Sequence, residues 1–189
     1  MPATSEANAV VTNGMSQWQR QGENANSAVV VSVRPEDFPG DDVLAGIALQ
    51  RQIERSAFQR GGMSYAAPAQ RWEDFLLNRA TTAWGKVKPT YRPAAAMSDL
   101  NGLFPAFVSE SLKAGIPLLA EKLSGFADGD AVLTAPETRS SAPYRIVRDE
   151  KGESSVGGLY PAGEGAGYAG GIMSSAADGM RSAEKICVG

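Results

Sequence analysis

Histidine is absent from the 189 residues of this sequence. Without an imidazole, the chain cannot form a Ser-His-Asp triad or a Cys-His pair, and the usual histidine metal sites are excluded. We therefore expect no metal site, and any catalysis must use other groups. The sequence does not identify a catalytic residue.

Cysteine is nearly absent, since Cys187 is the only one. This excludes an internal disulfide and is typical of a reducing compartment, so we expect a cytoplasmic location. No apolar stretch approaches the ~20 residues of a membrane helix, and the first residues lack a basic stretch followed by an apolar one. We expect a soluble protein with no membrane partner.

Clusters of basic residues are also missing. The chain has 18 Lys and Arg against 21 Asp and Glu, a net charge of −3, and a pI near 5.1. Because binding to phosphates requires clustered cations, we expect no nucleic acid partner. Hydrophobic residues make up 43% of the chain, and its length suits one soluble domain or two small ones.

Strand-forming runs occur near both ends of the chain. Two precede residue 34 and three follow residue 130: 9–12, 27–33, 131–134, 144–148 and 158–162. The run 27–33 is apolar at almost every position, as in a strand at the centre of a sheet. Each run is too short to be stable alone, so we expect the two ends to pair.

Between these runs the hydrophobic period becomes helical. Helices are predicted over 41–60 and 69–80, and a third helical region after Ser98 is expected to be broken by Pro105 and by 115–117. A last helix is predicted from 170 to 186. Its apolar face consists of Ile172, Ala176, Met180, Ala183 and Ile186. Three tryptophans are expected to pack in cores: Trp18, Trp72 and Trp84.

These elements predict an α+β fold. A mixed β-sheet is formed by both chain ends, with a helical layer inserted between them. Region 1–33 supplies a strand pair and 34–130 the inserted helical region. Region 131–189 supplies the return strands, a glycine-rich loop and the last helix.

The glycine-rich loop is the segment that indicates chemistry. Five glycines lie between Gly163 and Gly171, after a predicted strand and before a helix. Such a loop presents backbone N–H groups and the positive end of a helix dipole to an anion or carbonyl. Glu164 adds a carboxylate, which suits a polyol ligand. The loop does not follow the first strand of a βαβ unit, so tight turns or close packing explain its glycines equally well.

The residues 158–181, GLYPAGEGAGYAGGIMSSAADGMR, resemble the closing flavin-contact motif of a known family. The family is a group of uncharacterised bacterial FAD-dependent dehydrogenases within the glutathione-reductase-like flavoproteins. The resemblance continues through most of the chain, in the segments 11–16, 24–31, 62–71, 97–101 and 137–143.

The resemblance implies a C-terminal fragment of a FAD-dependent oxidoreductase. In that family a Rossmann unit at the N-terminus precedes a region like this one and holds the pyrophosphate and adenosine of FAD. This sequence lacks that unit. We therefore expect an incomplete FAD/NAD(P)-binding-type fold that supplies the substrate side and the flavin edge. By itself it should be inactive and without FAD.

The resemblance also implies site residues. Glu164 is expected to bind the ribityl chain, and Gly170, Gly171 and Ile172 to face the pyrimidine edge of the flavin. The expected flavin contacts are Gly163, Glu164, Gly165, Ala166, Gly167, Tyr168, Ala169, Gly170, Gly171 and Ile172. Candidates for substrate contacts are Asn24, Asn26, Arg139 and Ser140, and for these, turn and linker hydrogen bonds are at least as good an explanation.

Two other functions stay open from the residues alone. The loop and following helix could hold a small anion or a nucleotide in a stand-alone binding module. Alternatively, the apolar run 28–33 could pair with a second copy, giving a homodimer through exposed strand edges. The substrate and the electron acceptor are not identified by the sequence.

Overall fold

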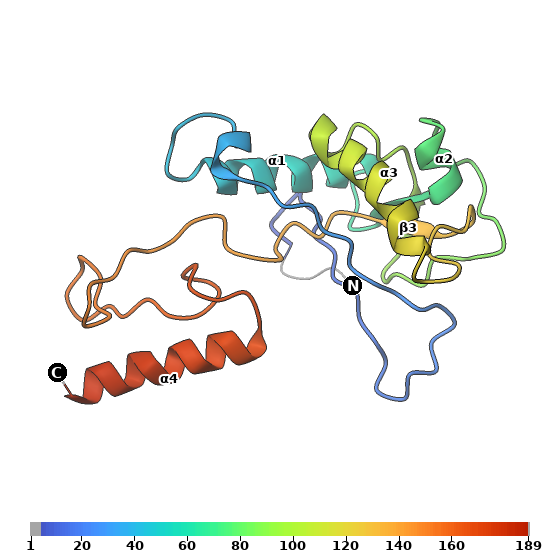
Figure 1. The fold of residues 1–189 in the computed structure, drawn as a ribbon. Helices are drawn as coiled ribbons and strands as arrows, with labels where there is room; N and C mark the ends of the chain where they lie inside the picture. Colours follow the sequence, from blue (N-terminus) through green and yellow to red (C-terminus); the bar gives the residue numbers. More distant parts are fainter. Residues whose placement is uncertain (1–4, 189) are drawn as a thin grey trace. The chain divides into compact units, whose positions relative to one another are not determined.

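The structure of this protein is a computed structural model that describes residues 5–188. The chain forms two compact units (Figure 1). Of the described residues, 5–34 and 50–138 form unit 1, and 35–49 and 139–188 form unit 2. Each unit therefore combines two separate stretches of the sequence, and each is described by itself.

The architecture is α+β, as predicted. In chain order the elements are a 3-10 turn (Pro35–Asp37), α1 (Ala45–Arg60), β1 (Ala67–Arg71), α2 (Trp72–Leu76), β2 (Ala95–Met97), α3 (Ala106–Ala120), β3 (Val132–Thr134) and α4 (Ile172–Val188). Helix α1 runs across the boundary between the units, and α4 belongs to unit 2. None of the helices within 5–188 has the length and apolar content needed to cross a membrane.

The sheet is mixed, as predicted, but the strands come from the middle of the chain. Its order is β2-β1-β3. Strand β1 pairs in parallel with β2, placing Ala67 opposite Ala95, and antiparallel with β3, placing Gln70 opposite Leu133. Only β3 lies in a run expected to form a strand. The prediction that both chain ends build the sheet is therefore wrong.

The first two runs are extended but are not strands of this sheet. Val10 and Val11 are fully buried, and Thr12 forms an isolated bridge in which its N–H donates to the carbonyl of Pro136 at 2.7 Å. In the run 27–33, Val29 packs against the core while Val30 is exposed. Apolar composition favours an extended chain, but a ladder also requires a neighbouring strand.

The runs 144–148 and 158–162 also remain outside any strand. Single hydrogen bonds connect these two runs to the rest of unit 2 instead of a strand ladder. The N–H of Ile146 donates to the carbonyl of Ala166 at 3.1 Å, and a guanidinium nitrogen of Arg148 donates to the carbonyl of Pro161 at 2.7 Å. A side chain therefore takes the place of the backbone ladder that the composition predicts.

The longest helices follow the predicted pattern. Before α1, Oδ1 of Asp42 accepts the N–H of Leu44 at 2.7 Å, and the helix ends just before Gly61 and Gly62, where Gly62 adopts a φ of 79°. Helix α4 lies within two residues of its predicted bounds at both ends.

The prediction of a broken third helix is wrong, because α3 is continuous. Pro105 lies immediately before its first residue, a position where proline loses no helical hydrogen bond. Pro117 lies within the last turn, while Val108 and Ile116 hold the helix in place as buried residues. Burial of this face therefore outweighs the local effect of the second proline.

The helix predicted over 69–80 is largely wrong. Its first residues belong to β1, and α2 is short. The reason is the fully buried side chain of Gln70. Its Oε1 accepts the N–H of Leu100 at 2.7 Å, and its Nε2 donates to the carbonyl of Arg79 at 2.7 Å. These bonds join distant segments, so no local periodicity predicts them.

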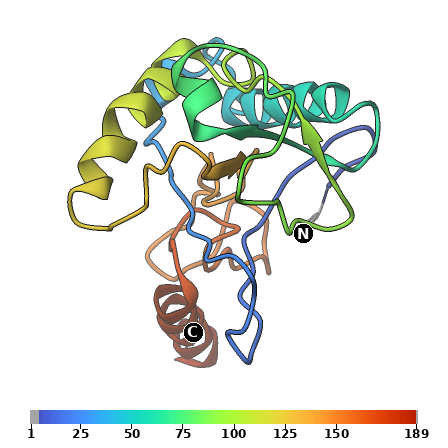
Figure 2. The ribbon, with the colours of Figure 1, turned by 90° about the vertical axis from the view of Figure 1, so that its right-hand side faces the viewer.

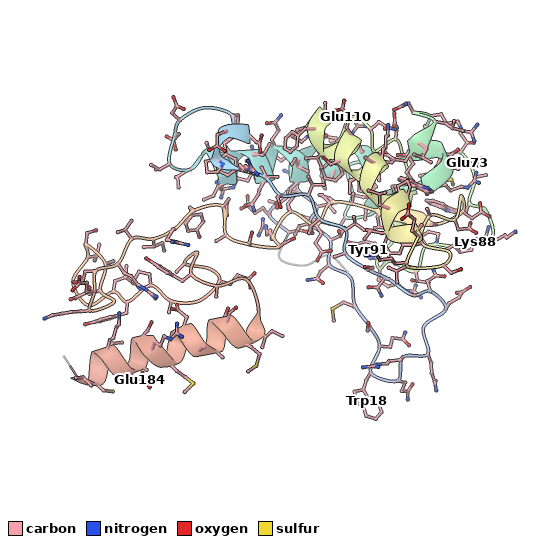
Figure 3. All side chains as sticks on the ribbon, viewed as in Figure 1. Trp18, Glu73, Lys88, Tyr91, Glu110 and Glu184 are labelled. Carbon is pink, nitrogen blue, oxygen red and sulfur yellow. The ribbon has the colours of Figure 1, made fainter. Side chains whose placement is uncertain are left out.

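The apolar core lies in unit 1. It is built by buried residues of α1, α2, α3 and the segments beside them: Val10, Ala57, Phe58, Ala67, Trp72, Phe75, Leu100, Leu103, Ile116 and Ala135. Figure 2 shows these helices gathered close to the strands of the sheet. Trp72 packs as expected, and Trp84 is half-buried. Trp18 does not pack, because it is 95% exposed on the loop after Asn13 (Figure 3).

Truncating the core of unit 1 tests this description. Leu100 is 1% exposed, so Leu100→Ala should lower the free energy of unfolding by about 2–5 kcal/mol through lost burial and a residual cavity. Leu77 is 57% exposed, and Leu77→Ala should change it by less than about 1 kcal/mol. Urea unfolding followed by tryptophan fluorescence measures both. Equal losses in the two variants would contradict the assignment of the core.

Candidate functional site

The glycine-rich loop lies in unit 2, between the segment 158–162 and α4. Two of its glycines are required by the backbone, since Gly163 and Gly167 have φ values of 73° and 81°. A Cβ at Gly167 would also collide with the carbonyl of Tyr144. The N–H of Tyr168 donates to the carbonyl of Gly163 at 3.0 Å, which closes the turn. These two glycines therefore have a structural role.

The remaining glycines of the loop have no such role. A Cβ at Gly165 or at Gly170 would meet no atom within 4 Å, and neither residue has a positive φ. At Gly171 a Cβ would only reach ordinary contact with the hydroxyl of Ser174 at 3.8 Å. Nothing within the described chain thus requires glycine at these positions. Their open space is suited to a flat ligand or another polypeptide.

The start of α4 adds backbone N–H donors to the loop. The carbonyl of Gly171 accepts the N–H of Ser175 at 2.9 Å and the hydroxyl of Ser174 at 3.0 Å. The N–H groups of the first helical residues have no partner inside a helix, and they carry the positive end of its dipole. Electron-rich groups of a ligand would be stabilised there.

Glu164 is half-buried beside these donors. Its carbonyl accepts the N–H of Gly167 at 2.9 Å. Its carboxylate has no hydrogen bond or ion pair with any residue in the part of the chain that the structure describes. The carboxylate can therefore accept hydrogen bonds from hydroxyl groups of a ligand.

An ion pair between Arg148 and Asp178 fixes the start of the loop. Asp178 of α4 is buried, and Arg148 reaches it with two nitrogens, at 2.7 Å and 3.0 Å. One carboxylate oxygen of Asp178 also accepts the N–H of Gly163 at 2.9 Å. This two-pronged arginine contact fixes both geometry and charge. The first residue of the loop is thereby attached to the middle of α4.

The ion pair also sets the protonation of its members. The hydrogen bond from Arg148, followed by that from the Gly163 N–H, lowers the pKa of Asp178 from 3.8 to about 2. The hydrogen bond to Asp178 in turn raises the pKa of Arg148 above its ordinary value. Asp178 is therefore a carboxylate at neutral pH, so it has no proton to donate, and its lowered pKa makes it a weak base.

Tyr168 is used for packing in this arrangement. The guanidinium of Arg148 lies 3.7 Å from the centroid of its ring, and that of Arg145 lies 5.0 Å from it. The phenol hydroxyl donates to the carbonyl of Ile146 at 3.0 Å. Cation–π contacts of this kind stabilise a surface aromatic. The predicted flavin contact by Tyr168 stays a prediction.

The spacing of Gly165, Gly167 and Gly170 matches Gly-x-Gly-x-x-Gly. In dinucleotide-binding proteins this spacing follows the first strand of a βαβ unit. Here no strand within 135–162 leads into the loop, so the structural context of that fingerprint is missing. The loop is not a dinucleotide-binding turn of that type.

The candidate substrate residues are divided between the units. Asn24 and Asn26 belong to unit 1, whereas Arg139 and Ser140 belong to unit 2. Asn24 donates to the carbonyl of Lys88 at 2.6 Å, which joins its loop to a distant segment, and Asn26 donates to the carbonyl of Met15 at 3.1 Å within the loop. Arg139 and Ser140 also interact with other residues of the chain. Their substrate role stays a prediction.

Sequence reasoning missed Arg148 and Asp178. The two lie 30 residues apart, and Asp178 reads as one polar residue of an amphipathic helix. The only local signal is an acid among small residues on the side of α4 opposite its apolar face. That signal cannot identify the arginine that pairs with it.

Comparison with known proteins gives two findings. Residues 1–140 match a family model described as FAD-dependent protein, C-terminal domain-like. A protein of Clostridium beijerinckii, described as an uncharacterized protein, is 48% identical to this chain over 185 residues. That match covers 97% of this chain and 35% of the relative. The chain thus spans about a third of the length of the relative it matches, and the family model ends before the glycine-rich loop.

The ion pair predicts an acid-dependent stability of unit 2. Since the folded pKa of Asp178 is lowered, its contribution is present above about pH 4 and is lost as the pH falls toward 2. Asp178→Asn should weaken α4 by about 2 kcal/mol at pH 7, and the difference from the wild type should shrink below pH 4. Hydrogen exchange of the α4 amides at each pH measures this difference in stability. Glu184→Gln, an exposed carboxyl on α4, serves as the control, and an equal loss there would contradict the role of Asp178.

Proposed function

The chain belongs to the family described as FAD-dependent protein, C-terminal domain-like, and from this membership we propose that it is the C-terminal portion of a FAD-dependent oxidoreductase. In this proposal the chain supplies the flavin-edge contacts and the substrate side of a dehydrogenase. The rest of the FAD is held by polypeptide that corresponds to the remaining two thirds of the relative. The chain alone is then inactive.

The observation that carries the proposal is the set of glycines with no internal role. Gly165, Gly170 and Gly171 leave open space next to the start of α4, where the first N–H groups have no partner within the helix. A flat isoalloxazine ring needs close approach to the backbone, which side chains would prevent. The positive end of the α4 dipole suits the pyrimidine edge, where negative charge develops on the reduced ring. The residues present fit the group.

Glu164 has a binding role in the proposal. Its carboxylate lacks a partner among residues 5–188, and the ribityl chain of a flavin carries hydroxyl groups that donate hydrogen bonds. A carboxylate accepts such bonds more strongly than a neutral group does. Bound FAD would supply the redox chemistry by accepting electrons from the substrate. Glu164 is not assigned to proton transfer.

Substrate contacts are proposed for the four polar residues found above, Asn24, Asn26, Arg139 and Ser140. Asn24 and Asn26 donate through their amide nitrogens, and among residues 5–188 no group donates to their amide oxygens, which can therefore accept hydrogen bonds from a substrate. Polar groups of this type fix the orientation of small ligands in otherwise apolar sites.

Titration with FAD tests the need for a second polypeptide. The isolated chain should bind little FAD, because the adenosine and pyrophosphate lack their usual contacts. Addition of the part of the relative that the match does not cover should produce tight binding, visible as a shifted flavin absorbance and quenched fluorescence. Stoichiometric binding by the isolated chain would contradict the proposal. Stabilisation of that chain by inorganic phosphate alone would favour a stand-alone anion-binding module instead.

The open glycines provide a sharper test. Gly165→Val and Gly170→Val should leave the melting temperature of the isolated chain within about 2 °C, because a Cβ there meets nothing. In the mixture with the second polypeptide, each should weaken FAD binding at least tenfold by blocking approach of the ring, a cost of about 1.4 kcal/mol. Gly115→Val is the matched control, since Gly115 is equally open but lies on α3. Unchanged FAD binding in both loop variants would refute the assignment.

A further inference from the structure

Helix α4 has its polar side inward and its apolar side outward. Asp178 and Ser182 are its buried residues, whereas its large apolar side chains, Ile172, Met173, Met180 and Ile186 among them, are exposed by 50% or more. This is the reverse of the arrangement expected for an amphipathic surface helix. The inversion needs an explanation.

The exposed residues form one continuous stripe. Residues three or four positions apart lie on the same side of a helix. By this spacing the α4 apolar face consists of Ile172, Met173, Ala176, Met180, Ala183 and Ile186, all of them exposed. A contiguous apolar stripe on a surface marks an interaction site, whereas single exposed apolar residues do not.

The polar side fixes the direction of this face. Asp178 binds Arg148 and the N–H of Gly163, and Arg148 also donates to the hydroxyl of Ser182 at 3.5 Å. Rotation of α4 to bury the stripe within unit 2 would break these contacts and leave Arg148 without its partner, a large cost for a part-buried charge. The polar contacts of Asp178 therefore keep the apolar face of α4 directed away from unit 2.

Unit 2 has little apolar core of its own. Its fully buried hydrophobic residues, among those described, are the two alanines Ala45 and Ala166. Meanwhile Val147 and Val156 are also exposed. A unit of this kind gains little hydrophobic stabilisation by itself. An external apolar surface would supply what the unit lacks.

We propose that the α4 apolar face is a docking surface for the polypeptide that corresponds to the two thirds of the relative outside the match. This rests on the proposed function, in which that polypeptide holds the rest of the FAD. Two observations favour this occupant. The matched relative is almost three times as long as this chain, and α4 begins directly at the glycine-rich loop. A polypeptide that brings the flavin to the loop therefore lies beside the first turn of α4.

The apolar face of α4 is too small to hold a partner by itself. Helix α4 has 17 residues, which corresponds to a length of about 25 Å at 1.5 Å per residue. With a width of roughly 10 Å, the face offers a few hundred Å², well below the roughly 800 Å² per partner of a stable complex. The face is therefore one part of a larger interface that also includes the loop.

Paired variants of α4 test the proposal. Met180→Lys combined with Ile186→Lys adds two positive charges to the face, and lysine keeps high helix propensity. Glu110→Lys, on an exposed residue of α3 and thus away from the face (Figure 3), changes the net charge by the same amount. The probe is the uncovered part of the Clostridium beijerinckii relative. Its binding to the double variant should be at least tenfold weaker than to the wild type, with at most a twofold change for Glu110→Lys.

The isolated chain provides the second measurement. Because Met180 is 66% and Ile186 50% exposed, the double variant should retain the melting temperature of the wild-type chain. Oxidation of Met180 by hydrogen peroxide, followed by mass spectrometry, should be fast in the isolated chain and slow once the probe is bound. A lower melting temperature in the double variant would show that the face packs within this chain, which overturns the proposal.

The remaining outcomes separate this inference from the proposed function. A wild-type chain that does not bind the probe, or a double variant that binds it normally, overturns the docking surface. A homodimer that the double substitution dissolves, seen by light scattering, also overturns it in favour of self-association. Binding that depends on the face but brings no FAD supports the docking surface and contradicts the flavin role. Normal FAD binding by the double variant contradicts the docking surface and leaves the flavin role supported.

Discussion

The ion pair between Arg148 and Asp178 is the constraint on which unit 2 depends. It attaches the start of the glycine-rich loop to α4, and the same arginine holds the carbonyl of Pro161 and stacks on Tyr168. Because the fully buried hydrophobic residues described in this unit are alanines, polar contacts take over the role that an apolar core has elsewhere. Such contacts fix geometry well but contribute modest net stability.

That constraint has two consequences at the surface. The loop is held in a tight turn while Gly165 and Gly170 stay open, and α4 turns its apolar side away from its own unit. Both features lack an explanation within the described chain. The proposed cofactor and the proposed second polypeptide would meet at this place and account for both features, so the two proposals have a common physical basis.

Unit 1 is organised differently. Its sheet and helices surround a conventional apolar core that includes Phe75 and Leu100, and most of the family match falls on it. Side-chain bonds of the buried Gln70 join β1 to distant segments of this unit. A self-sufficient core beside a unit without one is consistent with a chain that completes its second half by association.

The sequence by itself determined the elements that depend on local pattern. Helices α1 and α4 and strand β3 occur where periodicity and composition predict them, because capping residues, glycines and hydrophobic spacing act over a few neighbouring residues. It also indicated the glycine-rich loop, whose density of glycine is visible without a fold.

Only the tertiary structure decided which segments form the sheet, that Trp18 is exposed, and that Arg148 pairs with Asp178. Pairing of strands and of charges joins residues tens of positions apart, so its energy appears only when the chain has folded. The division of the loop glycines into required and open positions has the same origin. Space around a backbone atom is a property of the whole fold, and no local pattern encodes it.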